Sequence, residues 1–392
     1  MITPYISLYL RNVLGISYAE IGALILLVSV LPLSVVPFGG MVADRVGRRR
    51  VFLLSLGGEG ASMLLVAISM ARNSIYGVFL GGGLAGVAGS IAGPAISAYV
   101  ADMTPLLSER TLAYTWVRIG FNGGFTVGSL LGGVLIGFLG FPNTGLLAAG
   151  ILATSTIFLF ATLEPSPYDI ARTKGQAATV TASSRPGSLR ESFRALGRDR
   201  TFLVLCIAGL FTSMAYGHWN STFLLFSNTI LLVPYGILGA ALALNGVIVV
   251  FGQTPTTKLM RGQRHTFSAI LAVLLMALAF VALGGISLVS GAAIVAVFTF
   301  IVVLTIGENL GAIPSMTLPS NVAPATEIGS YNGVYGLFSG IGGSLSPLIG
   351  GIVLSTFSNY LAVWLILAIP CIPAILLFRW LGRRLPAAAN TV

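Results

Sequence analysis

The stretch Gly40-Met-Val-Ala-Asp44-Arg45-Val-Gly47-Arg48-Arg49-Arg50 separates two long apolar runs, residues 18–42 and 51–71. It places one carboxylate, four arginines and two glycines within eleven residues. A short basic turn between two apolar helices lies at a membrane surface, and loops rich in Lys and Arg stay on the cytoplasmic side. Residues 44–50 are therefore predicted to form a cytoplasmic turn between two membrane-spanning helices.

The overall composition indicates a polytopic membrane protein. Of the 392 residues, 56% are hydrophobic and only 8% are charged, whereas soluble proteins carry about 25% charged residues. The net charge of +10 follows membrane topology rather than nucleic-acid binding. All Lys and Arg residues except Arg11, Arg72 and Arg118 fall in segments predicted to be cytoplasmic: 44–50, 102–111, 164–200, 258–265 and 379–392.

Apolar segments long enough to cross a membrane occupy most of the chain. A spanning helix needs about 20 apolar residues. Residues 2–10 are apolar too, but at about 1.5 Å per residue they reach only halfway across. Complete spans are predicted at residues 18–43, 51–71, 75–101, 112–139, 144–163, 201–226, 234–257, 266–287, 291–318, 330–355 and 360–381.

An internal repeat accounts for the short beginning. Residues 17–23 match residues 234–240 at an offset of 217, which aligns Met1 with His218, deep inside the span 201–226. The repeat predicts an all-α polytopic membrane protein of the twelve-helix type, with two pseudo-symmetric six-helix halves and an incomplete first helix. Either the true start lies upstream of Met1 or the helix is truncated; the alternative is a short re-entrant or interfacial segment.

The two halves are predicted at residues 1–163 and 201–392, joined by a cytoplasmic linker at 164–200. Residues 173–187 are rich in Ala, Thr and Ser and read as a flexible connection. Ser188-Leu-Arg-Glu191 has the spacing of a capping box, so a short amphipathic helix is expected to follow it.

The opening stretch also resembles the signature loop of the major facilitator superfamily of transporters, Gly-x-x-x-Asp-Arg-x-Gly-Arg-Arg. An ordinary basic loop would explain the arginines but not the spacing of the glycines and the carboxylate. The resemblance implies that Asp44 stabilises a neighbouring helix N-terminus of the second half, near Ser330, in the outward-facing state. Asp102 is expected to pair with Arg45 or Arg49. The matching positions are Gly40, Asp44, Arg45, Gly47, Arg48 and Arg49.

A glycine-rich motif in the fifth span resembles the Gly-x-x-x-Gly-Pro-x-x-Gly-Gly motif of the superfamily's antiporters. The resemblance implies a helix bend with close packing, but Ser129 replaces the proline, which weakens the antiporter inference. The corresponding position in the second half is Pro347. The matching glycines are Gly124, Gly128, Gly132 and Gly133.

Two carboxylates within predicted spans are candidates for proton coupling. Ionisable groups in a membrane are costly and usually face a cavity or a partner. Glu308, in Gly307-Glu308-Asn309 before Pro314, resembles the tenth-helix carboxylate of drug:proton antiporters. The alternative for Glu308 is a fixed ion pair, for example with Arg118. Glu59 is a second candidate; alternatively it reaches interfacial water or an arginine of the signature loop.

Other polar residues within the spans are candidates to line a substrate cavity. Arg118 and Asn122 are four residues apart and share a helix face, as do Asn245 and Gln253, eight apart. Hydrogen bonding between helices is the alternative role for the amides. His218 can titrate near neutral pH, or can serve as a hydrogen-bonded spacer. Asn309 completes the set.

The sequence predicts a secondary active transporter in the plasma membrane that couples the proton gradient to efflux of small hydrophobic compounds. It has no glycine-rich phosphate loop and only two histidines, so neither ATP, a metal, another cofactor nor enzymatic chemistry is expected. We predict a monomer with a cytoplasmic C-terminus. The alternatives are a symporter or facilitator for a nutrient, and a non-transporting sensor with the same fold.

Overall fold

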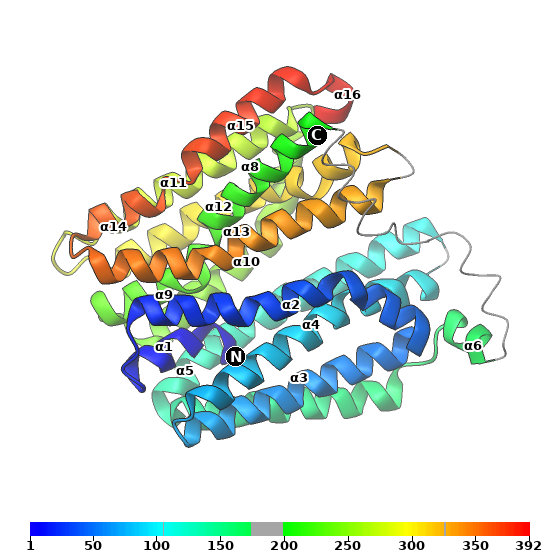
Figure 1. Ribbon diagram of the computed structural model, residues 1–392, viewed down its shortest axis with the longest axis horizontal. Coiled ribbons are helices and arrows are strands. Elements are labelled where there is room, and N and C mark those ends of the chain that lie inside the picture. Colours follow the sequence, from blue (N-terminus) through cyan, green and yellow to red (C-terminus); the bar gives the residue numbers. More distant parts are fainter. Residues whose placement is uncertain (105, 174–198, 325–326) are drawn as a thin grey trace. The chain divides into compact units, whose positions relative to one another are not determined.

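The computed structural model of the protein describes residues 1–104, 106–173, 199–324 and 327–392, and its elements are helical (Figure 1). The long helices are α2 (Tyr18–Val46), α3 (Arg48–Ala71), α4 (Ile75–Met103), α5 (Leu107–Thr162), α8 (Arg200–Tyr216), α10 (Tyr235–Met260), α11 (His265–Ile286), α12 (Ala293–Val322), α13 (Ile328–Thr356) and α15 (Cys371–Arg384). The shorter elements are η1 (Thr3–Tyr5), α1 (Ile6–Asn12), α6 (Pro167–Thr173), η4 (Gly217–Asn220), α9 (Thr222–Leu225), η5 (Phe226–Ile230), α14 (Tyr360–Leu367) and α16 (Ala387–Asn390).

The predicted spans are confirmed as helical segments, although those at 201–226 and 360–381 are each interrupted. Among the described residues, 10 helical stretches are long and apolar enough to cross a membrane. One of them, Leu112–Thr162, corresponds to two predicted spans, which meet at Gly140. Gly140 has φ 75° and ψ 172°, a conformation that a residue without a Cβ adopts most readily, so the chain turns there from one helix into the next.

The chain divides into two compact units, each described by itself. The first comprises Met1–Thr3, Leu27–Gly124 and Leu135–Arg185, and α3 packing on α4 is its main contact. The second comprises Pro4–Leu26, Phe125–Val134 and Pro186–Val392, where α12 packs on α10 and α11, and α8 packs on α13. The predicted amphipathic helix after Ser188 falls outside the described residues. The division into halves at 1–163 and 201–392 stays a prediction.

Repeat-related glycines occupy corresponding helix crossings within the second unit. A Cβ on Gly239 of α10 would lie 2.9 Å from the Ser129 carbonyl oxygen of α5. Likewise, a Cβ on Gly22 of α2 would overlap the Pro347 carbonyl oxygen of α13. Gly22 and Gly239 are the aligned residues of the repeat, and Ser129 aligns with Pro347. The internal repeat read in the sequence therefore has a counterpart in the packing.

The span predicted at 201–226 is interrupted. After α8 the chain forms the 3-10 helix η4, one turn of α9 and the π-helical η5, which ends at Ile230. Ser221, with φ −135° and ψ −63°, separates η4 from α9. Turns of 3-10 and π type inside a helix redirect side chains and often mark functional positions.

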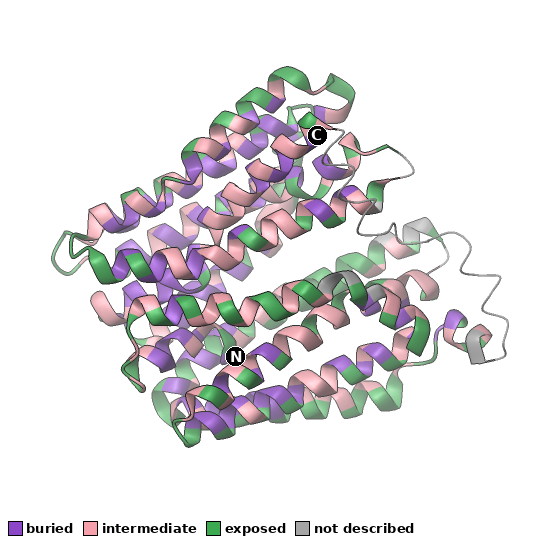
Figure 2. Ribbon diagram, in the orientation of Figure 1, coloured by how far each residue is buried: buried purple, intermediate pink, exposed green. Residues whose placement is uncertain are grey.

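Exposed residues, drawn in green, recur along the long helices (Figure 2). Many of the exposed residues are large and apolar, several of them on α5. Phe121 is 78% exposed and Phe138 is 84% exposed. Exposed apolar surface of this extent is unfavourable in water and favourable against lipid chains. The exposure pattern agrees with the apolar composition of the spans.

Candidate functional site

The signature stretch folds as a helix–glycine–helix junction rather than as an extended loop. α2 continues to Val46 and α3 begins at Arg48, so Gly47 is the only residue between them. Gly47 has φ 109°, which a residue with a Cβ adopts only under strain. Asp44 and Arg45 therefore belong to the last turn of α2.

Arg48 is the centre of the polar contacts in this junction. Its guanidinium forms ion pairs with Asp102 and, at 3.3 Å, with Asp44. It also donates to the Ala98 carbonyl oxygen at 3.2 Å and lies 4.3 Å from the centre of the Tyr168 ring. These contacts join α2, α3, α4 and α6 within the first unit.

The expectation that Asp102 pairs with Arg45 or Arg49 is wrong, because Asp102 pairs with Arg48. Arg49 instead donates to the carbonyl oxygens of Leu163 and Phe160, both at 2.7 Å, at the end of α5. Consecutive residues at a helix start point about 100° apart, so the two arginines reach different neighbours. A cation at the C-terminus of a helix is also favourable.

Residues 163–169, here called the clasp, hold the junction from the linker side. Asp169 accepts hydrogen bonds from the backbone N–H groups of Arg48 at 2.8 Å and Arg49 at 3.1 Å. Gly47 has no side chain with which to cap α3, so Asp169 satisfies donors that a helix start otherwise leaves open.

Two further hydrogen bonds complete the clasp. The Ser166 hydroxyl donates to Asp102 at 2.9 Å, and the Tyr168 hydroxyl donates to the Asp44 carbonyl oxygen at 2.9 Å. Asp169 was not among the residues predicted from the sequence. Its signal was the Ser-x-x-Asp spacing from Ser166, which forms a reciprocal cap at the start of α6.

Replacing Asp169 with Ala is expected to lower the free energy of unfolding by about 1 kcal/mol, because loss of a helix-capping side chain costs roughly 0.5–2 kcal/mol. Thermal unfolding of the purified protein would measure the change. Glu164→Gln is the matched control, since the clasp uses the Glu164 carbonyl oxygen, which accepts from Tyr99. An unchanged midpoint in Asp169→Ala would contradict the capping role.

A second polar group lies between α10 and α12 in the second unit. The Asn245 amide donates to Glu308 Oε2 at 2.9 Å and to Thr305 Oγ1 at 2.9 Å. The side chain of Tyr216, from α8, also lies near enough to interact with Glu308. Three helices thus contribute polar groups around the Glu308 carboxyl, and we refer to Tyr216, Asn245, Thr305 and Glu308 as the Glu308 cluster.

The other two amides predicted on these helices lie on the same seam. Asn309 donates to the Ile248 carbonyl oxygen at 3.1 Å, and Gln253 donates to the Asn309 carbonyl oxygen at 3.3 Å. The Asn309 side chain comes this close to α10 because Gly252 has no Cβ; a Cβ there would stand 2.7 Å from the Asn309 amide nitrogen. The spacing of Asn245 and Gln253 on one helix face thus matches the structure, with hydrogen bonding between helices as the observed interaction.

His218 takes part in a different contact. It is fully buried in η4, its Nδ1 lies 3.2 Å from Thr222 Oγ1, and its ring meets Phe280 edge-on. Among the described residues its Nε2 has no hydrogen-bond partner. The hydrogen bond of His218 therefore goes to the interrupted segment itself and not to the Glu308 cluster.

The remaining candidates are distributed over the first unit and α5. Glu59 is half-buried in the middle of α3. The Asn122 amide donates to the Arg118 carbonyl oxygen at 2.9 Å, so these residues do share a helix face.

Within the glycine-rich motif of α5, Gly133 lies at a close helix contact. A Cβ on Gly133 would overlap the Tyr235 carbonyl oxygen and approach Gly239, whereas nothing lies within 4 Å of a Cβ on Gly124. The backbone is non-helical at Gly140 and not within the motif.

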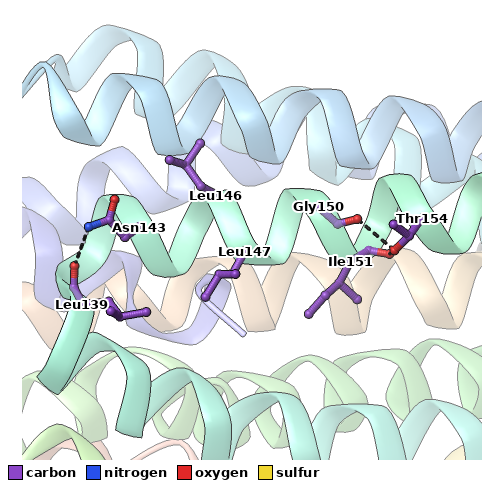
Figure 3. Close-up of a pocket in the computed structure, with 7 residues that line it drawn as sticks. All are labelled: Leu139, Asn143, Leu146, Leu147, Gly150, Ile151 and Thr154. Atoms are coloured by element: carbon purple, nitrogen blue, oxygen red, sulfur yellow. Dashed lines mark hydrogen bonds between the residues drawn. The ribbon is translucent and has the colours of Figure 1, made fainter.

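A hollow of about 600 Å³ follows the second part of α5 (Figure 3). Among the described residues its lining comes from this helix, and the polar side chains in it bond locally: Asn143 donates to the Leu139 carbonyl oxygen and Thr154 to that of Gly150. Leu146 and Ile151 are exposed. A groove lined mainly by apolar side chains suits lipid chains and offers few groups to orient a substrate.

Comparisons with known proteins agree with the fold. Residues 1–347 match the family model of the Major Facilitator Superfamily. An uncharacterized MFS-type transporter of Bacillus subtilis (strain 168), YqjV, is 26% identical over 91% of this chain and 83% of its own length. Multidrug resistance protein 2 of the same organism is 30% identical over 35% of this chain and 33% of its own length. A solved POT family transporter in complex with 5-aminolevulinic acid superimposes with a TM-score of 0.79 at 13% identity, covering 97% of this chain and 92% of its own.

Proposed function

Because the chain belongs to the Major Facilitator Superfamily, we propose that it is a proton-coupled exporter of small hydrophobic compounds that works by alternating access. The family makes it a multi-pass membrane transporter and not an enzyme. The proton gradient supplies the energy in this proposal, no cofactor takes part, and the transporter acts as a monomer in the plasma membrane.

The observation that carries proton coupling is the Glu308 cluster. A carboxyl on a membrane-spanning helix is costly when charged, and hydrogen-bond donors around it reduce that cost. Asn245 is such a donor, and the Tyr216 side chain lies near the same carboxyl. The membrane thus favours the neutral carboxyl, whereas the donors favour the charged one. Movement of the surrounding helices changes this balance and lets the carboxyl bind or release a proton. Alternating access requires such movement.

Export of hydrophobic compounds is supported by sequence similarity alone. The similarity to Multidrug resistance protein 2 covers about a third of the chain. The segment around Glu308 resembles drug:proton antiporters in its Gly307-Glu308 pair before Pro314. Drug-like efflux is therefore our first choice of substrate class.

A proton-coupled symporter or facilitator for a nutrient is the second candidate. The amides of Asn245, Gln253 and Asn309 form a seam of hydrogen-bond donors along α10 and α12. Recognition of a polar nutrient needs such donors. In the structure they already bond to protein groups, which favours the first candidate.

Everted membrane vesicles with an acid interior test the proposal. Addition of lipophilic cations and neutral drugs is expected to cause a compound-dependent proton leak in vesicles that contain the protein. Vesicles without the protein are the control. Equilibration of a labelled solute without proton movement would support a facilitator instead, and no response to any compound would count against export.

A further inference from the structure

The last residues of the chain fold back onto the connection between α10 and α11. Thr391 forms an antiparallel bridge with Arg264. The Val392 N–H donates to the Gln263 carbonyl oxygen at 2.8 Å, and the Gly262 N–H donates to the Val392 carbonyl oxygen at 3.1 Å. This segment thus pairs with the connection as a short strand pairs with a sheet edge.

Asn390 adds a contact that depends on its side chain. Its Oδ1 accepts from the Thr266 N–H at 2.9 Å, and its Nδ2 donates to Thr266 Oγ1 at 3.0 Å. Asn390 is 1% exposed. The N-cap residue of α11, Arg264, makes no side-chain cap of its own. Asn390 therefore performs the capping role for α11 from a distant part of the chain.

The same segment reaches α12. The Asn321 amide, near the end of α12, donates to the Ala389 carbonyl oxygen at 3.1 Å. Val392 packs against an apolar group that contains Met260 of α10 and Leu310 of α12. One short segment therefore contacts the ends of α10, α11 and α12.

We propose that these helix ends form a binding site for a short peptide with one helical turn followed by two extended residues, and that its occupant is the chain's own segment 387–392, in which α16 is that turn. The backbone pairing at 262–263 supplies affinity that does not depend on the side chains of the peptide. The Asn390 amide supplies selectivity, because Asn390 is the residue of the segment that inserts a buried polar side chain. Thr391 is a contrast, since its hydroxyl bonds only within the segment, to the Ala387 carbonyl oxygen.

Occupancy of this site would hold α10 and α12 together. Asn245 on α10 and Glu308 on α12 are in hydrogen-bond contact at 2.9 Å. Leu310, two residues beyond Glu308, lies in the apolar group against which Val392 packs. The segment thus acts as a strap that keeps the Glu308 cluster assembled. This consequence rests on the proposed function, whereas peptide binding does not.

The first test uses a chain that ends at Leu385, purified in detergent, and a labelled, C-terminally amidated peptide of residues 386–392. Saturable binding is expected by fluorescence anisotropy. The N390A peptide is expected to bind about tenfold more weakly, and the T391A peptide to bind like the wild-type peptide. Absence of saturable binding by a folded truncated chain, or equal binding of N390A, would overturn the proposal.

The second test uses the full-length chain and needs no truncated form. Arg261 and Arg264 are exposed trypsin sites in the connection. Trypsin is expected to cleave there several-fold faster in Asn390→Ala than in the wild type or in Thr391→Ala. Equal cleavage in all three would contradict a strap. Faster cleavage without a change in proton coupling would leave the binding site standing and count against its link to the Glu308 cluster.

Discussion

The Glu308→Gln variant is expected to lose the compound-dependent proton leak entirely while it still folds and enters the membrane. Gln has nearly the same shape as Glu and still accepts the hydrogen bond from Asn245, which the structure shows at 2.9 Å. It cannot release a proton. The change therefore removes proton exchange and leaves the packing of α10 on α12 in place.

Everted vesicles with matched amounts of protein would measure this effect. Glu20→Gln is the control, because Glu20 is exposed at the start of α2 and bonds only locally to Ser17. Retention of the leak in Glu308→Gln would place coupling elsewhere. Glu59→Gln then becomes the deciding variant, since Glu59 is the other half-buried carboxyl predicted within a span.

The Gly133→Val variant is expected to reduce transport by about fivefold to a hundredfold, because overpacking of a tight contact costs roughly 1–3 kcal/mol. A Cβ at this position overlaps the Tyr235 carbonyl oxygen and stands 2.8 Å from the Tyr5 hydroxyl. That hydroxyl donates to the Ser129 carbonyl oxygen at 2.8 Å, so the side chain has little room to yield. The crossing of α5 and α10 must therefore separate.

Gly137→Val is the matched control for this variant. Gly137 lies one turn further along α5, and nothing stands within 4 Å of a Cβ there. Both changes carry the same cost of valine in a helix, so a difference between them reports the crossing itself. Transport and thermal unfolding of the two purified variants would be compared, and equal values would show that the crossing tolerates a side chain.

Some of the candidate site was predictable because its signals are local. Glu308 and Asn309 stand out as polar residues in an apolar stretch, and the spacing of Asn245 and Gln253 places them on one face of a helix. Gly47 was expected for its match to the signature, and its positive φ gives the physical reason. The cap formed by Asp169 could not be predicted, because nothing in the sequence shows that a carboxylate in the linker reaches the start of α3.

The membrane-spanning helices, the internal repeat and the family could be predicted from the sequence, because they follow from local hydropathy, glycine spacing and a contiguous motif. The polar partners, in contrast, are known only from the folded structure. Arg48 pairs with Asp102, 54 residues away, and Asn390 caps α11 at Thr266, 124 residues away. Such partners depend on which helix ends the fold brings together. Several arginines could pair with a given carboxylate by charge alone. The fold decides which of them pairs with it by bringing the two side chains close together.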